Sequence, residues 1–220
     1  MRLIIFDVDG TLVDSQNHIV EAQTYAFKAA GLAPPTRERM LSIVGLSLQE
    51  AFVVLTDGDA VAAEKLSDAY RGYWQRQNGI KPYDDILYPG AMDTIAALAR
   101  APDTMLGIAT GKSMRGVLRL IEQCGWQNVF ATTQTSDTHP SKPHPSMILR
   151  AMEETGVEPQ HTWMIGDTTF DMSMAKSAKV HGIGVSWGYH PHEHLVEAGA
   201  EEVVHDFAGL LRRLDHARTT

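Results

Sequence analysis

The sequence predicts an α/β protein in which helices flank a parallel sheet and a further block of helices follows the first strand. Residues 3–6 are an unbroken apolar run, which is typical of a strand buried on both faces of a parallel sheet. Beyond residue 82, short apolar runs alternate with helical patterns, as they do in βαβ units. Almost nothing in residues 16–81 resembles a strand. The first strand therefore belongs with the second half of the chain, in a doubly wound, Rossmann-like core.

The helical block is expected to form a separate cap domain at residues 16–82, inserted between core segments 1–15 and 83–220. Its first helix is predicted from about residue 16 to Gly31, since glycine commonly ends a helix. Shorter helical patterns follow, with Gly45, Leu46 and Ser47 as a turn between the first two of them. These patterns cover residues 37–44, 48–55 and 60–77.

The core elements follow from the alternation after residue 82. Pro89-Gly90 introduces the first core helix, and Gly125 ends the second one. The predicted strands are 105–109, 129–132, 162–165, 182–186 and 203–204. The predicted helices are 91–100, 112–124, 145–156, 170–178 and 206–214.

Composition excludes several classes of function. The 220 residues carry a formal net charge of -8, which argues against general affinity for nucleic acid or for an anionic membrane. A single cysteine excludes an internal disulfide and fits a reducing compartment. Asp7 and Asp9 interrupt the only apolar run near the N-terminus, so no signal peptide is expected there. We expect a cytoplasmic protein, monomeric or weakly dimeric, without nucleic-acid or membrane partners.

Polar residues gather where the predicted strands end. Asp7, Asp9 and Gly10 follow the first strand, and Thr110-Gly111 follow the second. Lys142 lies in the loop before the helix at residue 145, and Asp167 follows the strand 162–165, with Asp171 four residues later. Because ligands of open α/β sheets bind beyond the carboxyl ends of the strands, all four groups face one crevice. Two carboxylates close together favour a hard cation such as Mg²⁺.

Each group also has a structural interpretation when taken alone. Asp-Gly after a strand is a common turn, and Asp or Thr before a helix is a common cap. Lys112 is expected to face solvent. His190, His192 and His194 follow Trp187-Gly188 and are expected to form a solvated loop rather than a metal site, because their spacing suits no helical site.

Taken together, the four groups resemble the haloacid dehalogenase-like hydrolases, in the phosphatase branch with a helical cap. The resemblance covers essentially the full length. It rests on DVDGT at residues 7–11, Thr110-Gly111, Lys142-Pro143 and GDTTFD at residues 166–171, in the order of that family. Residues 45–52 and 89–98 resemble phosphoglycolate phosphatase and its relatives most closely.

The resemblance implies a Mg²⁺-dependent phosphomonoesterase that hydrolyses a small phosphorylated metabolite. Asp7 would attack phosphorus and form an aspartyl-phosphate, and Asp9 would act as acid and then base, both of which general chemistry supports. Gly10, Thr110, Gly111 and Lys142 would hold the phosphate. The resemblance assigns Mg²⁺ to Asp7, the backbone carbonyl of Asp9, Asp167 and, more remotely, Asp171.

Substrate choice is expected to lie in the cap, with Gly45, Leu46 and Ser47 closing over the site. Hinges are expected near residues 14–16 and 82–85. Two alternatives stay open at this point. A phosphomutase of the β-phosphoglucomutase type keeps the same residues and differs in what accepts the phosphoryl group. A phospho-receiver or silent binding protein is a different class, although receivers are shorter and have no cap.

Overall fold

Six parallel strands form one sheet in the computed structural model, which describes residues 1–77 and 85–216. The strands are β1 (Arg2–Phe6), β2 (Thr104–Thr110), β3 (Phe130–Thr135), β4 (Thr162–Gly166), β5 (His181–Val185) and β6 (Glu202–Val204). Their order in the sheet is β3-β2-β1-β4-β5-β6. The chain runs outward from β1 to β3, returns across β1 to β4, and runs outward again. This order confirms the predicted doubly wound, Rossmann-like fold.

The central strand β1 is buried on both faces, as its apolar run predicts. Ile4 and Phe6 pack against one helical layer, whereas Leu3 and Ile5 pack against the other, and none of the four is exposed. Side chains alternate across a strand, so a strand covered on both faces needs apolar residues at every position. Helices α5 (Ala91–Ala99), α6 (Met114–Cys124) and α10 (Phe207–His216) supply the first layer, and α7 (Ser146–Thr155) and α8 (Thr169–Ala178) the second.

The structure differs from the prediction at strand β3 and at helix α9. Strand β3 extends to Thr135, three residues beyond its predicted end, because its polar residues Thr132 and Gln134 still pair with β2. Helix α9 (His192–Ala198) was not predicted. Its seven residues are mostly polar, and only Leu195 is buried, so the sequence offers no apolar stripe there.

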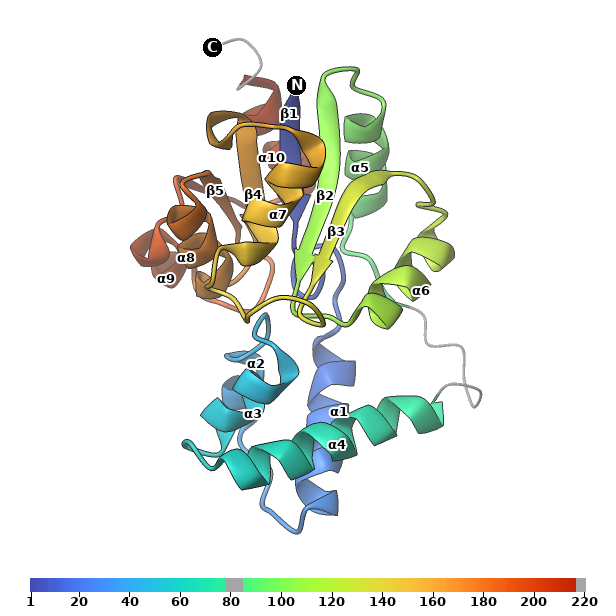
Figure 1. Cartoon of the computed structure of the whole chain (residues 1–220), viewed down its shortest axis with the longest axis vertical. Helices are drawn as coiled ribbons and strands as arrows, with labels where there is room; N and C mark the ends of the chain where they lie inside the picture. Colours follow the sequence, from blue (N-terminus) through green and yellow to red (C-terminus); the bar gives the residue numbers. More distant parts are fainter. Residues whose placement is uncertain (78–84, 217–220) are drawn as a thin grey trace.

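The remaining helices form a unit with its own apolar core below the carboxyl ends of the strands (Figure 1). They are α1 (Gln16–Ala29), α2 (Arg37–Leu41), α3 (Leu48–Leu55) and α4 (Ala60–Gln77), called the helical unit below. Helix α2 ends three residues earlier than predicted, and the chain then turns at Gly45, where φ is +102°. The second predicted hinge, at residues 82–85, lies outside the described residues except for Asp85.

Within the described residues, no helix is both long and apolar enough to cross a bilayer.

Candidate active site

The carboxyl ends of β1 and β2 open on a cavity of about 660 Å³ between the sheet and the helical unit. Strand β1 lies at the switch point of the sheet, where the strand order reverses and where ligands of such folds bind. The core lines the cavity with Asp7, Asp9, Thr110, Gly111 and Lys112. The helical unit lines it with residues that include Gln23, Gly45, Leu46, Ser47, Tyr70 and Trp74.

Asp7 lies at the floor of this cavity, one residue beyond β1. Its side chain is 1% exposed, and its Oδ1 lies 3.0 Å from Nζ of Lys142. Its Oδ2 is also buried and has no hydrogen-bond partner among the described residues. Burial raises the pKa of Asp7 to about 6, against the lowering effect of Lys142. At neutral pH the group is therefore an ionised carboxylate whose Oδ2 accepts no hydrogen bond within the described residues.

Lys142 is fully buried between two carboxylates. Its Nζ lies 3.0 Å from Oδ1 of Asp7 and 2.6 Å from Oδ1 of Asp171. Burial alone would lower the pKa of Lys142, but the charges of Asp171 and Asp7 outweigh it and raise that pKa above its usual value. The ammonium therefore stays charged although it is fully buried.

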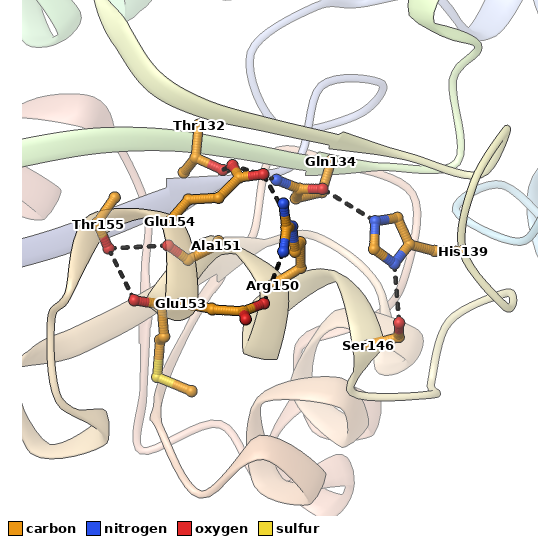
Figure 2. Close-up of polar contacts among 10 residues, drawn as sticks. Thr132, Gln134, His139, Ser146, Arg150, Ala151, Glu153, Glu154 and Thr155 are labelled. Carbon is orange, nitrogen blue, oxygen red and sulfur yellow. Dashed lines mark hydrogen bonds and ion pairs between the residues drawn. The ribbon is translucent and has the colours of Figure 1, made fainter.

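The loop that carries Lys142 is fixed at both ends by a polar network (Figure 2). The ring of His139 lies 2.9 Å from Oε1 of Gln134 on β3 and 2.8 Å from Oγ of Ser146 at the start of α7. Gln134 in turn donates to Glu154 at 2.8 Å. The network thus ties both ends of the loop to the sheet and to α7, which limits the positions that Lys142 can take.

Asp167 and Asp171 complete a cluster of three buried acids. Oδ1 of Asp167 accepts from Oγ1 of Thr11 at 2.9 Å, and Oδ2 accepts from the backbone N–H of Tyr189 at 2.9 Å. Burial and the neighbouring carboxylates of Asp171 and Asp7 raise the pKa of Asp167 well above its ordinary value. One carboxylate oxygen from each of Asp7, Asp167 and Asp171 lies within 4.8 Å of the others.

The donor atoms of this cluster fit a hard divalent cation. Its donors are all carboxylate oxygens, the ligand type that Mg²⁺ prefers, and the buried Oδ2 of Asp7 lacks a donor. Asp171 accepts the most hydrogen bonds of the three, because its oxygens accept from Lys142 and from both the hydroxyl (2.7 Å) and the backbone N–H of Thr168. The Asp9 side chain lies outside this cluster.

Two glycines allow close approaches that no side chain would permit. Gly10 has φ of +89°, and a Cβ there would lie 2.2 Å from Oδ2 of Asp167. A Cβ on Gly111 would lie 2.6 Å from the carbonyl oxygen of Leu46 and 2.8 Å from that of Gly45. In addition, the backbone N–H of Ser47 donates to Oγ of Ser141 at 2.8 Å. The structure therefore brings the turn at 45–47 against the core, next to the cavity.

The expectation that Lys112 faces solvent is wrong. Its side chain is 14% exposed, and its Nζ lies 2.8 Å from Oδ1 of Asp9. Helix α6 begins at Met114 with Ser113 as its cap, two residues later than predicted. Lys112 therefore lies in the turn at the sheet edge and not on the outer face of a helix.

The expectation of a solvated histidine loop is wrong for His190 and for the loop conformation, although His192 and His194 are exposed. Nδ1 of His190 accepts from the backbone N–H of Thr169 at 3.1 Å, so its Nε2 donates to the carbonyl of Ser42 in the helical unit, also at 3.1 Å. His192 and His194 lie in the first turn of α9. Sequence reasoning also missed Tyr70 and Trp74, whose spacing of four residues on α4 was the available signal.

Comparison with known proteins decides the family. The family model described as haloacid dehalogenase-like hydrolase matches residues 4–185, which include the strand ends, the acid cluster and the helical unit. The chain belongs to the haloacid dehalogenase-like hydrolase family. The match also spans the helical unit, which a phospho-receiver domain lacks.

Individual relatives place this hydrolase in the phosphoglycolate phosphatase-like branch. It is 34% identical over 210 residues to the probable phosphatase IndB of Dickeya dadantii, covering 94% of this chain and 90% of that protein. It is also 34% identical over 214 residues to phosphoglycolate phosphatase of Agrobacterium fabrum, with the same coverage. The crystal structure of a hydrolase from Pseudomonas syringae matches with a TM-score of 0.84 at 27% identity, over 98% of this chain and 99% of that one. The predicted family is therefore confirmed.

Proposed function

We propose that this hydrolase is a Mg²⁺-dependent phosphomonoesterase that acts on a small phosphorylated metabolite through an aspartyl-phosphate intermediate. The observation that carries the proposal is Asp7, a buried carboxylate with one unpartnered oxygen beside the charged Lys142. The phosphatase names of its relatives from Dickeya dadantii and Agrobacterium fabrum support the same reaction.

The proposed covalent step uses the carboxylate of Asp7. It forms an O–P bond to the phosphorus of the ester while the bond from phosphorus to the leaving oxygen breaks. The leaving oxygen takes a proton from the Asp9 carboxyl group. A water molecule then gives its proton to Asp9 and attacks the phosphorus of the aspartyl-phosphate, which releases phosphate and restores Asp7.

The remaining predicted residues would bind the phosphoryl oxygens and a cation. Gly10, Thr110 and Gly111 would offer backbone N–H groups and a hydroxyl to the phosphate, and Lys142 would supply positive charge. Asp7 and Asp167 would hold Mg²⁺ together with the backbone carbonyl of Asp9. Asp171 would hold the ammonium of Lys142 in place and would contact the cation through water. When bound, the cation would offset the negative charge that gathers around the phosphoryl group.

We further propose that the helical unit is the cap domain of residues 16–82 and that it selects the substrate. The turn of Gly45, Leu46 and Ser47 lies against Gly111, which supports its role as the closing loop. A small phosphorylated metabolite in the cytoplasm is the proposed partner, and the protein is proposed to act as a monomer or weak homodimer.

A panel of phosphorylated metabolites tests the proposed function. Phosphoglycolate, sugar phosphates, nucleotides and pyrophosphate should be incubated with and without Mg²⁺ while released phosphate is measured. We expect hydrolysis of at least one compound that stops when the metal is chelated. No release from any compound would contradict a phosphatase, and phosphoryl transfer between sugar phosphates in place of release would point to a mutase.

Mg²⁺ should stabilise the protein more at about pH 7.5 than at about pH 5. Because the pKa of Asp7 is raised from 3.8 to about 6, its contribution to stability is full below 3.8 and is lost as pH rises through about 6. The raised pKa of Asp167 acts in the same direction. Above pH 6 the ionised acids repel one another, and a bound cation should restore the stability that this repulsion removes. Protonated acids bind a cation poorly, so the effect of Mg²⁺ should be small at the lower pH.

Thermal unfolding midpoints with and without MgCl₂ at the two pH values provide the measurement. Asp167→Asn should remove most of the Mg²⁺-dependent rise at the higher pH, and Asp93→Asn, in the first turn of α5, serves as a matched control. Equal rises at both pH values would contradict the assignment of the acid cluster as the metal site.

A further inference from the structure

Lys112 belongs to a second ionic cluster, distinct from the three acids around Lys142. Its Nζ lies 2.8 Å from Oδ1 of Asp9 and 3.9 Å from Oδ1 of Asp85. The guanidinium of Arg119 lies 3.9 Å from the other oxygen of Asp85. The side chains of Asp9 and Lys112 are 13% and 14% exposed, and that of Asp85 is fully buried. Burial alone would lower the pKa of Lys112, but Asp9 and Asp85 raise it, so this ammonium stays charged.

Asp85 is held firmly by its backbone and not by its carboxylate. Its N–H donates to Oε1 of Gln123 on α6 at 2.9 Å, and its carbonyl accepts from Nε2 of the same residue at 2.8 Å. In contrast, neither carboxylate oxygen makes a hydrogen bond within the described residues. A buried carboxylate in that condition costs free energy. Its charge therefore acts on Lys112 and Arg119 through space.

In the described part of the chain, the carboxylate of Asp9 accepts one hydrogen bond, from the ammonium of Lys112. This bond takes up Oδ1 and leaves Oδ2 for a ligand in the cavity that both residues line. Proton transfer requires a donor oxygen close to the leaving oxygen and correctly aimed, so a freely rotating carboxyl group would be a poor acid.

We propose that Lys112, held in place by Asp85, is the positioning residue that aims the Asp9 carboxyl group at the leaving oxygen. The inference rests on the proposed function. In the acid step the proton on Oδ2 of Asp9 moves to the ester oxygen as the P–O bond breaks. Throughout that step the Lys112 ammonium keeps its proton and its hydrogen bond to Oδ1. An ammonium on Oδ1 also stabilises the carboxylate that this transfer leaves behind.

Two esters separate this role from a general structural one. Glycerol 3-phosphate releases an alkoxide, which needs a proton, whereas p-nitrophenyl phosphate releases a phenolate that leaves without one. For Lys112→Met we expect the single-turnover rate with glycerol 3-phosphate to fall about 100-fold, and the first-turnover release of p-nitrophenol to stay within about threefold of wild type. Lys112→Arg, which keeps the charge, should recover part of the loss.

Controls keep the test decisive. Lys176→Met removes an exposed lysine on α8 and should change neither rate. If Lys112→Met does not fold, Asp85→Asn gives the same test, with an expected loss of about threefold to tenfold confined to glycerol 3-phosphate. Equal losses on both esters would overturn the positioning role. Failure of wild type to hydrolyse either ester, or any compound of the metabolite panel, would instead contradict the proposed function.

Discussion

Replacing Asp7 with asparagine is expected to lower kcat by about 10⁴-fold or more, because an amide cannot serve as the nucleophile. Asparagine has nearly the same shape, so the cavity and its floor should keep their form. Lys142 would lose one of its two carboxylate partners and keep Asp171, 2.6 Å away. The metal-free variant should be at least as stable as wild type at neutral pH, because the raised pKa of Asp7 marks a carboxylate whose ionisation opposes folding.

Phosphate release and trapping of the phosphorylated protein after acid quenching give two independent readouts. Wild type should carry a phosphoryl group that hydroxylamine removes, as expected of an acyl phosphate, and Asp7→Asn should carry none. Asp93→Asn is a matched control, because Asp93 is exposed in the first turn of α5 and does not line the cavity. Substantial turnover by Asp7→Asn would rule out the covalent mechanism.

Replacing Lys142 with methionine should lower the free energy of unfolding as well as the phosphatase activity. Methionine fills much of the same space but leaves Asp7 and Asp171 facing each other without a cation. Removing one partner of a buried ion pair commonly costs about 3–5 kcal/mol. The pKa of Asp7 should rise further, since Lys142 is the largest influence that lowers it.

Urea unfolding at neutral pH without metal measures this loss, and Lys176→Met on the surface of α8 is the matched control. The double variant Lys142→Met with Asp171→Asn should recover part of the stability, because it removes one of the two repelling charges. Phosphatase activity should remain lost in the double variant. A Lys142→Met protein as stable as wild type would show that the two carboxylates are protonated or hydrated in its absence.

Much of the core could be predicted because parallel sheets impose simple rules on sequence. A strand covered on both faces must be apolar throughout, which makes β1 visible at residues 3–6. The carboxyl ends of neighbouring parallel strands share one edge, so Asp7, Thr110 and Asp167 converge across 160 residues of chain. The ends of strand β3 are harder to predict from the sequence, because a strand at the edge of the sheet tolerates polar residues.

The parts that escaped prediction depend on contacts between distant segments. Lys112 resembles the first residue of an exposed helix, and only the late start of α6 turns it toward Asp9. Asp85 has no local pattern at all, since its backbone is held by Gln123, which lies on a distant helix. His190 is similar, because its partner Ser42 belongs to a different set of helices.

The helical unit has an apolar core that shares no residue with the two clusters packed on the sheet. Phe27, Phe52 and Leu66 belong to that separate core, while Tyr70 and Trp74 line the cavity from α4. Substitutions at these two aromatic positions should therefore leave the packing on the sheet unchanged, because neither residue belongs to the clusters there. Given the proposed role of the helical unit in substrate choice, libraries of substitutions on α4 are expected to vary substrate preference while the residues of the chemical step stay constant.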